Sequence, residues 1–307
     1  MLDSGRLHRD ADRFLQVIRD EIAPASGPAP ALQTFDDFDE LFARITRRII
    51  FGDRARADAA ITDLLRKLMR EANRPLGLKK SPSFDDFNSR IRQYLIAAEP
   101  GSLAARCAQT PSSEETRVEN QVPHWMFAMW ETLGANAVRA LALILAHPGA
   151  DERVRHEMKA ADLTTAAGID GFKYLEGCVQ EAMRLWPTTP MLVRETVVQA
   201  LLDGEAVPTG TQVLILNSFN HRDHERYSLA DSFAPETWAD GTPNPLFNHL
   251  SSDTQLCAGK DLALFLAKAV LATLLDGRRL TLVHPKLDPN RPIPYAYDYF
   301  RVRFEAR

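Results

Sequence analysis

Three short stretches of the sequence combine residue types that could do chemistry. Cys257 lies in Asn248 to Ala263 (NHLSSDTQLCAGKDLA), after a polar loop and before a strongly helical run, and Gly259 permits a tight turn. A cysteine at the start of a helix meets backbone N–H donors and the positive end of the helix dipole, which favour thiolate over thiol. Such a thiolate can ligate a soft or borderline metal, whereas a lone cysteine is often only a small buried apolar side chain.

The second stretch lies in the most apolar segment, where Glu131 and Thr132 stand within Phe127 to Gly134 (FAMWETLG). A carboxylate buried without partners is costly, so Glu131 should be hydrogen-bonded, line a wet cavity or be protonated. One interpretation is a local break in the helix that handles protons or water beside a reactive centre. The alternative is a partly exposed Glu at a helix edge and a Thr bonded back to its own helix.

The third stretch is Leu175 to Pro187 (LEGCVQEAMRLWP), in which Glu181 and Arg184 are three residues apart. They share one helical face and can form an ion pair. Such a pair is usually a solvated surface contact that contributes little. Here the pair lies near the end of an apolar helix that Pro187 terminates, and this position distinguishes it from an ordinary surface pair.

Other kinds of site have weaker support. A zinc site made of Cys257 with His221, His224 and His249 lacks regular ligand spacing. The chain has no G-x-S-x-G elbow of the kind that carries a nucleophilic serine. The glycine signatures of ATP and dinucleotide sites are also absent.

Composition excludes several further classes. The 307 residues carry 37 basic and 41 acidic side chains, a formal net charge of −4, which argues against a nucleic-acid binder. Three widely spaced cysteines make no disulfide framework and indicate a reducing compartment. The charged first twenty residues are unlike a secretory signal. Val122 to Ala146 could span a membrane by length, but Glu131 and Arg139 lie inside it and favour a buried helix.

The surrounding pattern is mainly helical, with short strands only late in the chain. Apolar residues recur at helical spacing from Leu7 to Ile22, Phe38 to Ile49 and Ile61 to Met69, and Ala23 to Ala31 (APASGPAPA) predicts a loop. The predicted strands are Val193 to Val198, Gln212 to Leu216, Leu280 to Val283 and Tyr299 to Phe304.

The order and rough spacing of the three stretches resemble cytochrome P450, densely from about Gln121 to the end and more loosely over residues 1–100. Some positions depart from the family pattern. Met129 and Asp253 each stand where a Gly is usual, and Leu250 stands where a Phe is usual. Gln255 stands in place of an Arg or His, and Thr237 stands in place of an Arg. The resemblance is carried by Ala128 to Thr132 (AMWET), Glu181 to Pro187 (EAMRLWP), Arg194 on a strand, Asn220 to Asp223 (NHRD), Phe233 to Trp238 (FAPETW), Cys257 to Gly259 (CAG) and the closing Pro292 to Phe304.

The resemblance implies one P450-like domain over residues 1–307, mainly α with small β-sheets. Met1 to Arg6 looks like the sequence just after the family's third helix, so the N-terminal sheet and first helices of the fold are expected to be missing. A fold without that sheet would leave apolar surface and strand edges uncovered.

The resemblance also implies a haem b cofactor (iron protoporphyrin IX) with the Cys257 thiolate as metal ligand. Haem would lie between the long helix at Ala128 and the loop of Cys257 and Gly259, and Arg194 would hold a propionate. Glu131 and Thr132 would hold water and relay protons as the catalytic pair. Glu181 and Arg184 would be structural and hold the cysteine loop in place.

The implied activity is a monooxygenase that inserts one oxygen atom from O2 into a hydrophobic small molecule, with electrons from a ferredoxin or flavodoxin and its NAD(P)H reductase. An apolar lining of Trp125, Phe127, Met129 and Trp130 would admit many substrates. The expected location is cytoplasmic, with neither membrane nor nucleic acid as partner. Two alternatives stay open: a catalytically inactive haem-binding remnant, and a helical scaffold whose motifs are accidental.

Overall fold

The computed structural model describes residues 2–23, 32–74, 81–111, 113, 115–239, 241 and 244–306. Most of the predicted loop from Ala23 to Ala31 lies outside the described residues. The helices are α1 (Ala11–Ile22), α2 (Phe35–Phe51), α3 (Ala59–Ala72), α4 (Ser83–Ala97), α5 (Leu103–Gln109), α6 (Val118–Phe127), α7 (Leu133–Ala146), α8 (Pro148–Lys159), α9 (Ala166–Asp170), α10 (Lys173–Leu185), α11 (Asn217–Asn220) and α12 (Lys260–Leu275), with short turns η1 (Asp53–Ala55), η3 (Pro235–Trp238), η4 (Asp253–Gln255) and η5 (Tyr299–Arg301).

Local sequence explains where the predicted helices begin and end. Thr34 and Asp37 form a capping box at the start of α2, in which each side chain bonds the backbone N–H of the other residue. Gly52 ends α2 with a φ of 100°, in the left-handed region that glycine adopts without a steric penalty. The apolar residues of α1 and α2 that recur at helical spacing are buried, as their spacing predicts.

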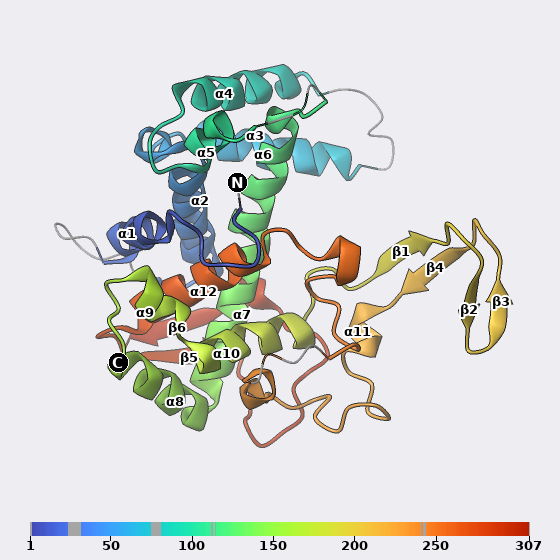
Figure 1. Cartoon of the computed structure of the whole chain (residues 1–307). Helices are drawn as coiled ribbons and strands as arrows, with labels where there is room; N and C mark the ends of the chain where they lie inside the picture. Colours follow the sequence, from blue (N-terminus) through green and yellow to red (C-terminus); the bar gives the residue numbers. More distant parts are fainter. Residues whose placement is uncertain are drawn as a thin grey trace.

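The apolar segment around Glu131 forms one long helix that runs through the molecule (Figure 1). It consists of α6, a π-helical segment η2 (Ala128–Thr132) and α7. All but Arg139 and Leu145 of the first thirteen residues of α7 are buried, which confirms a core helix. No helix within the described ranges is both long and apolar enough to cross a membrane.

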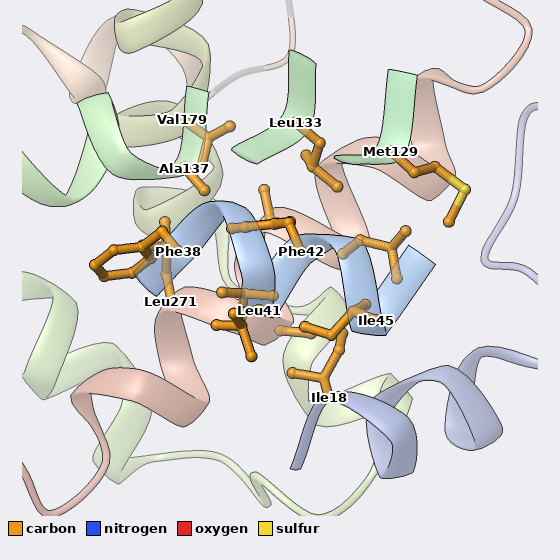
Figure 2. Close-up of a cluster of buried hydrophobic side chains, with 14 of the residues drawn as sticks. Ile18, Phe38, Leu41, Phe42, Ile45, Met129, Leu133, Ala137, Val179 and Leu271 are labelled. Atoms are coloured by element: carbon orange, nitrogen blue, oxygen red, sulfur yellow. The ribbon is translucent and has the colours of Figure 1, made fainter. Parts of the chain in front are cut away.

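The core forms where α2 packs between the long helix, α1, α10 and α12. Figure 2 shows apolar side chains from these five segments meeting around α2. Burial of this surface is the main stabilising contribution to the helical body. The labelled residues are Ile18, Phe38, Leu41, Phe42, Ile45, Met129, Leu133, Ala137, Val179 and Leu271.

The described strands form three small antiparallel ladders. Strand β1 (Leu192–Glu195) pairs with β4 (Gln212–Ile215), β2 (Ala200–Leu202) with β3 (Glu205–Val207), and β5 (Leu280–His284) with β6 (Arg303–Ala306). The prediction of a strand from Tyr299 was wrong at its start, because Tyr299–Arg301 forms the turn η5 before β6. The β1–β4 ladder and the β2–β3 hairpin project away from the helical body (Figure 1).

Candidate haem-thiolate site

Cys257 lies in the loop between η4 and α12, and its side chain is exposed to solvent. Its backbone N–H bonds the carbonyl of Leu250 at 2.9 Å, and its own carbonyl accepts from Lys260 N–H at 3.1 Å. The loop therefore closes on itself directly before the first turn of α12. Such a thiol is open to a ligand, in contrast to Cys178, which is buried in the core.

The cysteine loop contains two residues with left-handed backbone. Ser251 has a φ of 58° and Asp253 a φ of 53°, a region in which a side chain is strained and glycine is not. Asp253 is the position four residues before Cys257 where the resemblance leads one to expect a glycine. The backbone geometry at this position therefore suits glycine although the residue is an aspartate.

The segment that carries Glu131 and Thr132 is a π-helical turn, which confirms the predicted break in the helix. The N–H of Leu133 bonds the carbonyl of Ala128, five residues earlier. Such turns occur often at functional sites, because they displace side chains from regular helical register. Ala128, Glu131 and Thr132 are half-buried, whereas Met129 and Trp130 face the core.

Glu131 lines a cavity of about 380 Å³ between α2, α3 and the long helix. Burial and the Asp39 carboxylate raise the pKa of Glu131 above its usual value, and the Arg66 guanidinium opposes them. Arg66 forms an ion pair with Asp39 and stacks over the Trp130 ring at 4.6 Å from its centre, while Trp130 Nε1 donates to Asp39 at 2.7 Å. The cavity places the charged side chains of Asp39 and Arg66 beside the half-buried Glu131 carboxyl group.

The predicted pair of Glu181 and Arg184 is completely buried. Arg184 Nε and Nη2 donate to the two Glu181 oxygens at 2.6 and 2.8 Å. The remaining Arg184 donors bond the carbonyls of His221, Leu229, Ala230 and Ser232, on the segment that follows α11. The pair thus attaches α10 to a long irregular segment, which supports its predicted structural role.

Trp238 takes the role in this network that an arginine at position 237 was expected to have. Its Nε1 donates to Glu181 at 2.9 Å, and the N–H of Ala234 donates to the same carboxylate at 3.0 Å. Thr237, at the arginine position itself, instead bonds back to the carbonyl of Ala234. The Glu181 carboxylate is therefore saturated with donors even though the third charged member is missing.

The other expected site residues lie apart from this network. Arg194 on β1 is exposed, bonds only the neighbouring Val193 carbonyl, and among the described residues pairs with no carboxylate. Gly259 lies at the foot of α12, where a Cβ would be 3.9 Å from Leu2. The zinc alternative is not supported, since within the described ranges no three His, Cys, Asp or Glu side chains gather as metal ligands would.

Helix packing buries Trp125 and Met129 in the core, and their predicted place in an apolar substrate lining stays a prediction. Trp130 is also buried and reaches only the cavity that Glu131 lines. Sequence reasoning missed two further residues of this region: Trp238 and Asp39. Trp238 was within a quoted motif, but nothing in the sequence signalled that Asp39 would approach Glu131 from α2.

Comparison with known proteins identifies the architecture. The family model for cytochrome P450 matches residues 28–294. This chain belongs to the cytochrome P450 family. Cytochrome P450 proteins of known sequence include a cyclooctat-9-en-7-ol 5-monooxygenase from Streptomyces melanosporofaciens, 25% identical over 320 positions that cover 92% of this chain and 67% of that protein. Cytochrome P450 4c3 from Drosophila melanogaster is 30% identical over 58% of this chain, which spans only 35% of that relative.

Solved P450 structures share the fold at low identity. A cyanobacterial CYP120A1 bound to retinoic acid superimposes with a TM-score of 0.79 at 17% identity, covering 98% of this chain and 76% of that one. At this identity the likeness shows the fold alone, mainly helical with small sheets.

Haem b is the cofactor of the P450 family, and the residues of this chain fit it. The donor it needs is a thiolate, and Cys257 presents an exposed sulfur in the loop directly before α12. Arg194 offers an exposed guanidinium that pairs with no carboxylate in the described part of the chain, and this group can hold a carboxylate through two parallel hydrogen bonds.

Proposed function

We propose that this P450 is a haem-thiolate monooxygenase that inserts one oxygen atom from O2 into a hydrophobic organic substrate. The observation that supports this most is the exposed Cys257 thiol at the start of α12, in a loop closed by its own backbone hydrogen bond. When bound, the haem supplies oxygen activation, and thiolate donation favours O–O cleavage.

The protein side chains take separate roles in this proposal. Glu131, whose pKa is raised by burial and by Asp39, holds and passes protons together with Thr132. Arg194 holds a haem propionate, and Ala128 and Gly259 are small residues that leave room for the macrocycle. Glu181 and Arg184 are structural: they attach the segment from His221 to Trp238 to α10, and this segment in turn leads to the cysteine loop.

The proposed electron donor is a ferredoxin or flavodoxin with its NAD(P)H reductase. This choice of partner rests on the family resemblance, since the polar pocket of about 200 Å³ beside the start of α12 carries both basic and acidic side chains. We propose a cytoplasmic location, since three widely spaced cysteines make no disulfide framework and suit a reducing compartment. A hydrophobic substrate agrees with the compound named for the Streptomyces relative, cyclooctat-9-en-7-ol.

The first test is the spectrum of the reduced protein under carbon monoxide. We expect a thiolate-type Soret band that disappears in Cys257→Ala and persists in Cys107→Ala, because Cys107 lies on α5, away from the loop. The absence of any bound haem would contradict both the enzyme and the haem-binding remnant. Haem binding without turnover, assayed with a surrogate ferredoxin system, would favour the remnant.

The second test concerns Thr132. We expect Thr132→Ala to consume O2 and NAD(P)H with less product formed per electron, because a hydroxyl in the proton path is lost. Product yield and O2 uptake measured together check this. Unchanged coupling would contradict the proton-relay role.

A further inference from the structure

His221 connects two segments that the proposed site needs to keep together. It follows α11, and its side chain is fully buried. Its Nδ1 lies 3.1 Å from the carbonyl oxygen of Arg184 on α10, and its Nε2 lies 2.8 Å from the backbone nitrogen of Asn248. One imidazole ring therefore bridges the end of α10 and the beginning of the cysteine loop.

The two partners determine the state of the ring. A carbonyl oxygen can only accept and a backbone N–H can only donate, so Nδ1 must carry the proton and Nε2 must present its lone pair. A doubly protonated ring would lose the bond to Asn248. Burial, together with the nearby Arg184 charge, lowers the pKa of His221 to about 4 and keeps the ring neutral.

The groups around the ring agree with a neutral imidazole. Arg184 donates Nη1 to the His221 carbonyl at 3.0 Å, and its own charge is compensated by Glu181 on the same helix. Phe247 and His249 each meet the ring edge-on, with centres 6.0 Å away. Arg222, the next residue, turns away to Asp231. No carboxylate among the described residues pairs with the His221 ring.

Backbone hydrogen bonds continue from Asn248 to the thiol. The Asn248 carbonyl accepts from Ser251 N–H at 3.1 Å, and the Leu250 carbonyl accepts from Cys257 N–H at 2.9 Å. The position of the Cys257 backbone thus depends on where Asn248 is held. In addition to the connection along the chain, the His221 side chain provides a direct contact between Asn248 and the end of α10.

We propose that His221 is a positioning residue, which holds the base of the Cys257 loop against α10 through a neutral imidazole protonated on Nδ1. Its effect on haem ligation rests on the function proposed above, whereas the bridge itself is a property of the protein without cofactor.

The unaltered chain provides the first test. In ¹³C,¹⁵N-labelled protein at neutral pH, the imidazole nitrogens of His221 are assigned through bonds from the backbone signals of the same residue. We expect a protonated Nδ1 and an unprotonated Nε2. A ring protonated on Nε2, or a charged ring, would overturn the proposal even if every variant failed to fold.

The second test uses two substitutions that each preserve one half of the bridge. His221→Gln keeps an acceptor near the place of Nε2, whereas His221→Asn keeps only a donor near the place of Nδ1. We expect the Asn248 amide to exchange about tenfold faster in His221→Asn, as for one lost buried hydrogen bond, and to stay near the unaltered rate in His221→Gln. His156→Asn, at an exposed position on α8, is the matched control.

The same variants link the bridge to the cofactor. In haem-loaded protein, we expect His221→Asn to convert part of the thiolate-type Soret band to a form without thiolate ligation, and His221→Gln to retain the band. Equal Asn248 exchange in the Asn and Gln variants would overturn the positioning role. A missing thiolate band in the unaltered protein would instead contradict the proposed function and leave the exchange result valid.

Discussion

At the scale of single residues, the cysteine loop has the backbone of a glycine-rich turn but few of its glycines. Ser251 and Asp253 both have positive φ, whereas Ser252 between them is extended with a φ of −148°. A left-handed residue with a side chain costs about 1–2 kcal/mol relative to its relaxed conformation. The loop that presents Cys257 is therefore held in shape partly at the expense of stability.

Two identical substitutions at neighbouring positions test this strain. We expect Ser251→Gly to raise the free energy of unfolding by about 0.5–1 kcal/mol, because glycine removes the steric cost at positive φ. Ser252→Gly should lower it by a similar amount, about 0.5–1 kcal/mol, since only the unfolded chain gains freedom there. Urea denaturation measures the free energy of unfolding of both variants. If Ser252→Gly stabilised the protein as much as Ser251→Gly, strain at positive φ would not be the explanation.

At the scale of elements, α10 is the support on which the irregular segment from Asn217 to Trp238 is built. Gly177 on α10 allows η3 to approach so closely that a Cβ there would lie 2.3 Å from the Pro235 carbonyl. Next to this contact, Glu181 and Arg184 satisfy backbone groups that no regular element could satisfy. The buried ion pair thus bonds backbone groups of this segment that, in a sheet, would bond a neighbouring strand.

Removing one member of the buried Glu181–Arg184 pair should therefore lower the free energy of unfolding much more than removing a surface ion pair does. We expect Arg184→Ala to lower the free energy of unfolding by about 3–5 kcal/mol, because it leaves the Glu181 carboxylate buried and uncompensated. Arg92→Ala, which breaks an exposed contact with Glu119 at 3.7 Å, should cost less than about 1 kcal/mol. Thermal or chemical denaturation compares them. Similar losses for both variants would disprove the structural role of the buried pair.

At the scale of the molecule, apolar surface is unevenly covered. The helical body buries most of its large apolar side chains, with Ile96 on α4 an exception, while the β1–β4 ladder and its surroundings expose many of theirs. Val193 and Leu214 are cross-strand partners and are 59% and 56% exposed. A two-stranded ladder is marginal by itself.

The buried histidines make stability depend on pH. Burial lowers the pKa of His221 to about 4 and, with neighbouring charges, that of His249 to about 3, so the folded state disfavours their protonated forms. Because the unfolded chain binds these protons near pH 6.5, their contribution is full above that pH and is lost as pH falls toward 4.

We expect His221 alone to add a slope of about 1.4 kcal/mol per pH unit between roughly pH 6 and 4.5. His221→Gln should remove this slope, while His156→Gln, at an exposed position, should keep it. Denaturant titrations at several pH values measure it. An unchanged slope in His221→Gln would show that another group dominates the acid sensitivity.

The sequence by itself determined the helical body and the order of the motifs. Apolar periodicity depends only on neighbours within a helix, so α1, α2, α3 and the long buried helix could be predicted, as could the break at Glu131. The family and its cofactor followed from the ordered set of motifs. The single-domain boundary over residues 1–307 stays a prediction, and so do the roles of all the site residues: Ala128, Glu131, Thr132, Glu181, Arg184, Arg194, Cys257 and Gly259.

Only the tertiary structure decided which distant groups meet. Asp39 raises the pKa of Glu131 from another helix, Trp238 takes the place of a missing arginine, and His221 reaches both Arg184 and Asn248. No local pattern encodes such contacts, because each depends on how two elements far apart in sequence pack. The same holds for the left-handed backbone at Ser251, which loop closure imposes on a residue that would not adopt it alone.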